Sequence, residues 1–267
     1  MFKRLLFPLM VPLLTLVALP CAAAPVSKTI GYEIGDQKFE GRLIYDNASK
    51  KKRPALLMAP NWLGPTDAAF KQAQEIAGKD YVIFVADMYS TAVRPKNTDE
   101  AGAASKSVYA DPAAMRARIG KALEVMKAQA GTAPIDLTRI GAIGFCFGGA
   151  NVLELARGGA DVAGVVTFHG ALKKVSAEPS KPITAKILVL HGADDPYVPA
   201  DQVATFEQEM RDAKTDWQLV KFGNAVHSFT DPDSHLAGQA DYNPVAAKRA
   251  FRMMHDFFDE VFAGKKA

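Results

Sequence analysis

Cysteine is scarce in this sequence, because only Cys21 and Cys146 occur among its 267 residues. Cys21 lies in an amino-terminal segment that we expect to be removed, which leaves a single thiol in the mature chain. A single thiol excludes an intramolecular disulfide, and an unpaired thiol in an exported protein is a candidate for chemical reactivity. The scarcity of cysteine therefore directs attention to Cys146.

The sequence also lacks a strong charge of either sign, fixed-period repeats and low-complexity tracts. Its formal net charge is +3 at pH 7, and Lys3 and Arg4 of the amino-terminal segment account for two of these charges. Such a balance gives no basic surface for nucleic acid. No linker divides the chain, and its length suits one large domain, which we expect over residues 27–265.

Residues 1–24 have the order of a secretory signal peptide. Two positive charges are followed by an almost entirely apolar stretch over residues 5–20 and then by small residues. This stretch contains three prolines and is shorter than the about 20 residues that a membrane-spanning helix needs. Cleavage after Ala23 or Ala24 is favoured over a retained anchor or a lipid on Cys21. We therefore expect an exported protein, periplasmic or secreted, without stable membrane association after cleavage.

Short apolar runs alternate with helical patterns along the rest of the chain. Residues 32–34 and 39–45 predict an antiparallel strand pair, with Gly35 and Asp36 in the turn. Later strands are predicted at residues 54–59, 81–86, 140–145, 162–168, 187–190 and 217–222, and helices at residues 65–79, 111–126, 150–156, 200–213 and 244–262. This alternation predicts an α/β fold with one mostly parallel sheet covered by helices on both faces. Residues 94–106 are polar and are expected to form an irregular loop.

The hexapeptide GFCFGG, residues 144–149, lies between a predicted strand and a predicted helix. A strand, a glycine-flanked corner and a helix form the layout of a nucleophile elbow, whose usual pattern is G-x-S-x-G. Here Cys146 stands at the position of the serine. Gly144 and Gly148 are needed because side chains there would collide with the neighbouring strand and helix. The alternative is a buried cysteine in an ordinary βα turn.

Two further polar side chains follow predicted strands, where sheets of this kind place their functional residues. They are Asp195 and His227, and the chain order of nucleophile, acid and histidine is that of α/β-hydrolase triads. The histidine would take the proton of the Cys146 thiol, and the carboxylate would fix the histidine tautomer. Asp195 is preferred as the acid because Pro196 fixes the following turn, with Asp194 as the alternative. Singly, each residue could also be a solvated loop residue without a role.

Acyl transfer also requires hydrogen-bond donors for an oxyanion. Backbone N–H groups usually supply them, one after the nucleophile and one in an earlier strand–helix loop. Phe147 fills the first position, and Trp62 is preferred over Leu63 for the second. Trp62 could equally be a lining residue, which is compatible with a main-chain role. Candidates for the substrate pocket are Asn61, Leu63, Tyr89 and His169.

A metal site is not predicted. The two-histidine helix motif is absent, and no spacing in the sequence indicates that His191 and His227 converge with Asp194 and Asp195 on an ion.

With these motifs the chain resembles the dienelactone hydrolase family of α/β-hydrolases. The likeness extends from about residue 30 to residue 262, and the matching stretches are residues 87–89, 144–149, 191–196, 198–199, 225–229, 242 and 246–247. The resemblance implies a Cys146–His227–Asp195 triad and an acyl-thioester intermediate. It also implies hydrolysis of a lactone or a small carboxylic ester without a cofactor.

Asn61 departs from the family pattern, because the best-known members carry a glutamate in the aligned loop. There the carboxylate takes part in activating the resting thiol, and an amide cannot accept that proton. The dienelactone substrate is not carried over either, since anion-binding arginines cannot be placed from the sequence, and Arg94 is one weak candidate.

Two other functions use the same sequence features. A non-catalytic small-molecule-binding protein could retain the α/β-hydrolase fold, although such a protein would be expected to lose one of the three catalytic residue types. An acyltransferase would use the same triad with an acceptor other than water. For either function, and for the hydrolase, a monomer is favoured.

Overall fold

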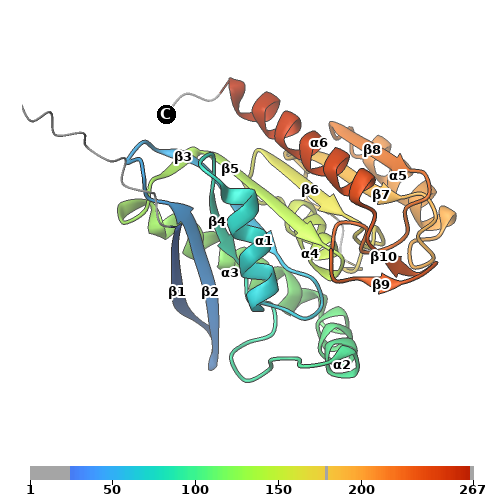
Figure 1. The fold of residues 1–267 in the computed structure, drawn as a ribbon, viewed down its shortest axis with the longest axis horizontal. Coiled ribbons are helices and arrows are strands. Elements are labelled where there is room, and N and C mark those ends of the chain that lie inside the picture. The colour runs from blue at the N-terminus through green and yellow to red at the C-terminus, as the bar shows by residue number, and fades with distance from the viewer. Residues whose placement is uncertain (1–24, 178–179, 265–267) are drawn as a thin grey trace, which may run out of the picture.

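A computed structural model describes residues 25–177 and 180–264. These residues form one eight-stranded sheet in the order β1-β2-β4-β3-β5-β6-β7-β8, packed between helices (Figure 1). The sheet strands are β1 (Pro25–Ile34), β2 (Gln37–Asp46), β3 (Arg53–Ala59), β4 (Val82–Val85), β5 (Ile135–Phe145), β6 (Gly164–Phe168), β7 (Lys186–Gly192) and β8 (Trp217–Phe222). The helices are α1 (Asp67–Ala77), α2 (Thr98–Tyr109), α3 (Pro112–Ala128), α4 (Phe147–Arg157), α5 (Ala200–Asp212) and α6 (Pro244–Ala263). The predicted signal peptide, residues 1–24, lies outside the described residues.

The direction of the strands confirms the fold class predicted from the sequence. β1 and β2 pair antiparallel around a turn at Gly35, whose φ of 56° is favourable for glycine. β2 is also antiparallel to β4, whereas the six strands β4, β3, β5, β6, β7 and β8 all run parallel to one another. The chain is therefore a mixed α/β domain with a mostly parallel sheet and an antiparallel amino-terminal pair.

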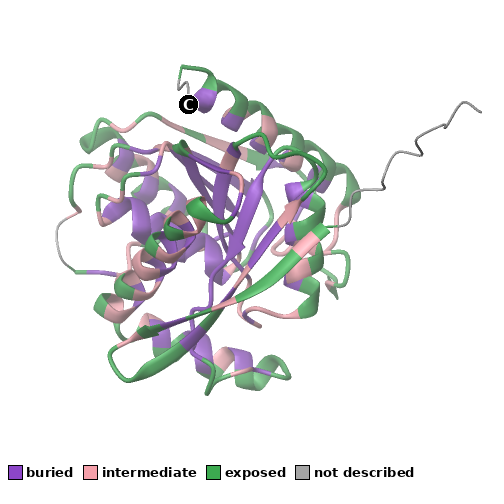
Figure 2. Ribbon diagram, turned by 90° about the vertical axis from the view of Figure 1, so that its left-hand side faces the viewer, coloured by how far each residue is buried: buried purple, intermediate pink, exposed green. Residues whose placement is uncertain are grey.

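Helices cover both faces of the sheet, as the continuous apolar runs of the central strands require. α3, α4 and α5 contribute to the core on one face, and α1 and α6 contribute to the core on the other (Figure 1). All five residues of β6 are buried, and the central strands form the buried middle of the molecule in Figure 2. No helix within the described residues is long and apolar enough to cross a membrane.

The prediction of an irregular loop over residues 94–106 is wrong, because α2 begins at Thr98. Its amino terminus is capped in both directions: the Asn97 side chain accepts from the Glu100 N–H at 2.9 Å, and the Glu100 carboxylate accepts from the Lys96 N–H at 2.9 Å. This capping pattern is present in the sequence. The helix was missed because its buried positions are mostly alanine and serine, which give a weak apolar stripe.

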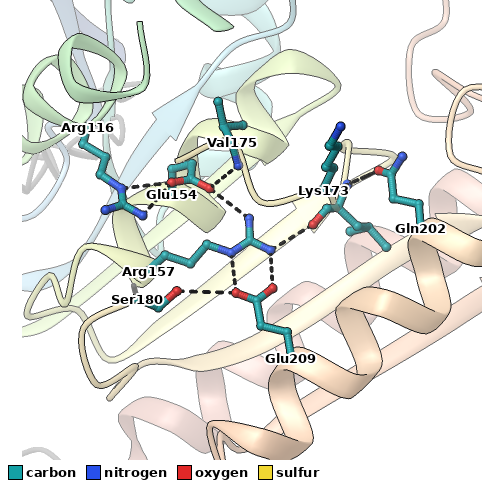
Figure 3. Close-up of polar contacts among 9 residues, drawn as sticks. Arg116, Glu154, Arg157, Lys173, Val175, Ser180, Gln202 and Glu209 are labelled. Carbon is teal, nitrogen blue, oxygen red and sulfur yellow. Dashed lines mark hydrogen bonds and ion pairs between the residues drawn. The ribbon is translucent and has the colours of Figure 1, made fainter. Parts of the chain in front are cut away.

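Charged side chains gather at the carboxyl-terminal end of α4 (Figure 3). Arg157 is 1% exposed and pairs with Glu154 at 3.1 Å and with Glu209 of α5 at 2.7 Å. Glu154 is fully buried and also pairs with Arg116 of α3 at 2.9 Å. The Arg157 guanidinium donates in addition to the Leu172 carbonyl at 2.9 Å. These ion pairs connect α4 to α3, to α5 and to the segment after β6.

Candidate active site

Cys146 lies at the corner between β5 and α4. Its φ of 53° is in the left-handed region that few non-glycine residues adopt, as expected of a nucleophile elbow. The corner is closed by hydrogen bonds from the Cys146 N–H to the Phe168 carbonyl at 3.0 Å and from the Gly149 N–H to the Cys146 carbonyl at 2.9 Å. A Cβ at Gly144 would collide with the Gly148 backbone, and a Cβ at Gly148 would collide with the Ala59 carbonyl of β3. Close backbone packing therefore requires both glycines.

The structure brings Cys146, His227 and Asp195 together in one line of hydrogen bonds. His227 Nε2 lies 3.1 Å from Cys146 Sγ, and His227 Nδ1 lies 2.8 Å from Asp195 Oδ2. The second oxygen of Asp195 accepts from the Tyr197 N–H at 2.8 Å. Asp194, the alternative acid, is exposed, whereas Asp195 is 6% exposed. Of the two aspartates, Asp195 is therefore the one that contacts the histidine.

A short hairpin that the sequence analysis did not predict holds His227 in place. It consists of β9 (His235–Leu236) and β10 (Ala240–Asp241). The His227 N–H donates to the Gln239 carbonyl at 3.1 Å, and the His227 carbonyl accepts from the Asp241 N–H at 3.1 Å. Both backbone groups of His227 are thus fixed by residues that follow it in the chain.

His227 is mostly buried, and its partners decide its charge. Burial alone would lower the pKa of His227, but the hydrogen bonds to Asp195 and Cys146 and the negative charges of both groups raise this pKa to about 10. The site is therefore suited to hold an imidazolium between a carboxylate and a thiolate. Such a thiolate is the reactive form of cysteine.

The loop after β3 contains an N–H group without an internal acceptor. The Asn61 carbonyl accepts from the Gly64 N–H at 2.9 Å, and the Asn61 side-chain oxygen accepts from the Leu63 N–H at 3.0 Å. The Trp62 carbonyl accepts from the Tyr89 hydroxyl at 2.8 Å. The Trp62 N–H, by contrast, has no acceptor among the described residues. Of the two candidate oxyanion donors in this loop, Leu63 is thus already engaged and Trp62 is not.

Phe147, the other candidate donor, is the first residue of α4. The first N–H groups of a helix have no partner within that helix, and they lie at the positive end of its dipole. The Phe147 N–H has no acceptor elsewhere in the described part of the chain. The phenyl ring of Phe147 stacks on Tyr89 with ring centroids 5.4 Å apart.

A cavity of about 330 Å³ lies between α1 and the segments around β9 and the start of α6. Its lining includes Phe145 and Ser228, the chain neighbours of Cys146 and His227, but none of the three hydrogen-bonded residues themselves. Its walls include Asn61 and His169 from the predicted pocket set, while Leu63 and Tyr89 are not among its lining residues. The other lining residues are Ala68, Ala69, Lys71, Gln72, Glu75, Phe145, Ser228, Thr230, Asp231, Pro232, Asp233, Tyr242, Pro244, Ala247, Lys248 and Phe251. Apolar rings and alanines form much of the wall, and acidic and basic side chains are mixed.

His169 lines this cavity and its ring also contacts His227. The two imidazole rings lie edge to face with centroids 5.2 Å apart, and His169 Nε2 lies 2.8 Å from Thr230 Oγ1. Burial, followed by the charge of His227, lowers the pKa of His169 well below its ordinary value, so this ring is neutral. No motif in the sequence marks Thr230, although its position three residues after His227 places it on the same loop.

Comparison with known proteins identifies the family. The family model described as "Dienelactone hydrolase family" matches residues 39–262 of this chain. The chain belongs to the dienelactone hydrolase family. It is therefore a hydrolase with the α/β-hydrolase fold, and the resemblance seen in the sequence is confirmed.

Solved structures and curated sequences agree with this assignment. The crystal structure of the dienelactone hydrolase-like promiscuous phosphotriesterase P91 from metagenomic libraries is 34% identical, with a TM-score of 0.83 over 89% of this chain and 99% of that chain. A crystal structure from Klebsiella pneumoniae, named "Putative Dienelactone Hydrolase", has the same fold at 18% identity. Its TM-score is 0.74, over 89% of this chain and 99% of that chain. A Bradyrhizobium relative named "Probable 2-oxo-3-(5-oxofuran-2-ylidene)propanoate lactonase" is 30% identical over 45% of this chain. The alignment spans about half of that relative, 49% of its length.

Arg94, the weak candidate for binding a substrate anion in this dienelactone hydrolase family member, is bound to other groups. Its guanidinium pairs with the buried Asp87 carboxylate at 2.8 Å and donates to the Ser90 carbonyl. Asp87 accepts also from the Tyr89 N–H, so this pair organises the segment after β4. Within the described residues, no group of three or more His, Cys, Asp and Glu side chains is arranged to hold a metal ion.

Proposed function

We propose that this chain hydrolyses small carboxylic esters or lactones, with Cys146 as the nucleophile, His227 as the general base and acid, and Asp195 as the residue that orients His227. The observation that carries the proposal is the continuous hydrogen-bonded line from Asp195 Oδ2 through the imidazole to Cys146 Sγ, at a residue with positive φ at the start of a helix. Membership of the dienelactone hydrolase family and the lactonase name of the Bradyrhizobium relative support this substrate class.

The proposed reaction has two halves. The Cys146 thiolate attacks the carbonyl carbon, a C–S bond forms, and the carbonyl electron pair moves onto oxygen, where the N–H groups of Phe147 and Trp62 donate to it. The pair then returns, the C–O bond to the alcohol breaks, and the leaving oxygen takes the Nε2 proton of His227. In the second half, water gives a proton to His227 and attacks the acyl-thioester, which releases the acid and restores the thiolate.

We infer that a compact, uncharged part of the substrate occupies the cavity that His169 and Ser228 line. Its volume of about 330 Å³ is at the lower end of the range for ligand pockets, and its acidic and basic side chains are mixed. Gln72 and Gln74 of α1 provide a matched test, because only Gln72 lines the cavity. Gln72→Trp should lower kcat/KM for a benzoate ester much more than for an acetate ester, and Gln74→Trp should change neither. An equal loss on both esters in Gln72→Trp would contradict this placement.

A second activity is supported by one neighbour. The P91 structure, 34% identical over 89% of this chain, is that of a promiscuous phosphotriesterase. We propose that the same thiolate attacks the phosphorus of an activated phosphotriester such as paraoxon, with release of p-nitrophenolate. Burst release of p-nitrophenol that is lost in Cys146→Ala would support this activity, and no release above the buffer rate would contradict it.

Export is proposed from residues 1–24, whose sequence has the order of a signal peptide. Expression of the full chain in a Gram-negative host, followed by fractionation and amino-terminal sequencing, tests this directly. A soluble periplasmic or secreted product that begins near residue 24 or 25 supports export. A full-length product that stays in the cytoplasm or in the membrane contradicts it.

The hydrolase proposal is tested by turnover of p-nitrophenyl acetate by the wild type and by Cys146→Ala, with iodoacetamide inactivation measured in the presence and absence of substrate. We expect turnover that disappears with the thiol and substrate protection against inactivation. Ligand binding without turnover would instead indicate a binding protein. Ester products formed from added alcohols, in excess over the free acid, would indicate an acyltransferase.

A further inference from the structure

The peptide group between Trp62 and Leu63 is held at both of its polar ends. Its carbonyl accepts from the Tyr89 hydroxyl at 2.8 Å, and its N–H donates to the Asn61 side chain at 3.0 Å. The preceding peptide group is held through its carbonyl by the Gly64 N–H at 2.9 Å. With these contacts in place, the direction of the remaining Trp62 N–H is fixed by its neighbours.

Tyr89 contacts the second candidate donor as well. Its ring stacks on Phe147 with centroids 5.4 Å apart and planes inclined by 20°. Tyr89 is itself fixed, because it is 4% exposed and its N–H donates to the buried Asp87 carboxylate at 3.0 Å. Burial, followed by the negative charge of Cys146, raises the pKa of Tyr89 above its ordinary value, so the hydroxyl keeps the proton that it donates. One buried side chain thus contacts both N–H-bearing residues.

We propose that Tyr89 is a positioning residue for the oxyanion site. This role of Tyr89 rests on the proposed function, because it concerns the N–H groups that would bind the oxyanion. Trp62 follows β3 and Phe147 follows β5, so the two donors belong to separate segments whose spacing no local turn can fix. Tyr89 follows β4 and connects the two segments, through its hydroxyl to Trp62 and through its ring to Phe147. Donors must be fixed before the reaction to stabilise a developing charge, and Tyr89 supplies that rigidity.

Tyr109 is the matched control. It also contacts Phe147, edge to face with centroids 5.4 Å apart, and burial likewise raises its pKa. Its hydroxyl makes no hydrogen bond to Trp62 or to any other residue within the described part of the chain. Tyr89→Phe and Tyr109→Phe therefore remove the same atom from two rings that pack on one phenylalanine, and only the first removes the bond to Trp62.

The experiment compares both variants with the wild type in three assays. They are the kinetics of p-nitrophenyl acetate hydrolysis, inhibition by a small trifluoromethyl ketone that forms a tetrahedral oxyanion with a thiolate, and alkylation of the Cys146 peptide by iodoacetamide, which forms no oxyanion. For Tyr89→Phe we expect kcat and the ketone affinity each to fall about tenfold, while KM and the alkylation rate change less than about twofold. Tyr109→Phe should stay within about twofold in all assays.

Three results would overturn the role of Tyr89. They are an unchanged ketone affinity in Tyr89→Phe, a fall in alkylation rate parallel to the fall in kcat, and an equal effect of Tyr109→Phe. Thermal melting of both variants verifies that they fold. A wild type whose turnover does not depend on Cys146 would overturn the proposed function and this inference together. An active wild type with unchanged ketone affinity in Tyr89→Phe would overturn the inference alone.

Discussion

In helix α4, the buried charged groups at the carboxyl-terminal end all have partners, whereas the first backbone N–H at the amino-terminal end has none among the described residues. At the carboxyl-terminal end, the buried Glu154 and Arg157 are satisfied by each other, by Glu209 and by a backbone carbonyl (Figure 3). At the amino-terminal end, the Phe147 N–H has no acceptor among the described residues, and the Cys146 thiol has His227 as its hydrogen-bond partner. Cys146 is also held at a φ of 53°.

Groups that stabilise the fold and groups proposed to take part in the reaction thus lie at opposite ends of a helix of eleven residues. Buried charges stabilise a fold only when they are paired, and removing one partner leaves the other uncompensated. Reactive groups need the opposite, since a donor that is already satisfied cannot bind a developing oxyanion. We therefore expect substitutions at the amino-terminal end to change turnover and substitutions at the carboxyl-terminal end to change stability.

The largest effect should come from His227→Ala. Without the imidazole, the thiol has no base and the leaving group has no acid, so kcat/KM for p-nitrophenyl acetate should fall at least about 10³-fold. The melting temperature should change much less than turnover, because the buried Asp195 carboxylate loses its imidazole partner but still accepts from the Tyr197 N–H at 2.8 Å. A melting temperature that falls together with activity would break the proposed separation.

Glu154→Gln should lower the free energy of unfolding and leave turnover nearly unchanged. It removes one counter-charge from the buried Arg157, which should cost about 3–5 kcal/mol in the free energy of unfolding. Turnover per folded molecule should stay near the wild-type value. Glu207→Gln is the control, because its pair with Arg211 is partly exposed and is worth about 0–1 kcal/mol. Urea denaturation with parallel kinetics measures both quantities, and equal losses in the two variants would contradict the account.

Asp195→Asn should have a smaller effect on turnover than His227→Ala. The amide keeps the geometry but removes the charge that stabilises the imidazolium, so kcat/KM should fall by about 10⁴-fold or less, and by less than in His227→Ala. Asp194→Asn is the matched control, and its rate should stay within about twofold of the wild type because that side chain is exposed. Equal losses in the two variants would show that the carboxylate contact to His227 is not what matters.

The pH dependence should give the smallest effect and report the proton on His227. Its pKa is raised to about 10, so the imidazole is protonated below this pH and loses its proton above it. An ethyl ester needs that proton on its leaving alkoxide, and its kcat/KM should fall about tenfold per pH unit above about pH 10. A p-nitrophenyl ester leaves as a stable phenolate and should fall less steeply. Identical profiles for the two esters would contradict the role of His227 as the acid.

The sequence was sufficient for features that depend on chain order and on local pattern. Continuous apolar runs predicted the parallel strands, and the glycines around Cys146 predicted the corner between β5 and α4. Asp195 and His227 could be named because parallel strands end at one edge of a sheet, so residues far apart in the chain meet there. Asp195 could be preferred over Asp194 through the neighbouring proline.

Features that depend on contacts between distant segments could not be predicted. α2 has few apolar residues to give a helical period, and β9 and β10 are two residues long. The hydrogen bond from Tyr89 to Trp62 joins residues 27 positions apart. Nothing in the local sequence indicates that Tyr89 contacts the loop after β3 instead of lining the pocket. Two partners of Arg157 lie on other segments, α5 and the chain after β6, and a single arginine in a helix is usually exposed.

The proposed mechanism requires that Cys146 carries the acyl group during turnover. It is tested most directly by rapid acid quench of the enzyme with a slowly hydrolysed p-nitrophenyl ester, followed by mass spectrometry of the Cys146 peptide. We predict an acyl adduct on this peptide that forms with the burst of p-nitrophenol, decays at the turnover rate and is labile to hydroxylamine. Turnover without any adduct on Cys146, or an adduct on another residue, would contradict it.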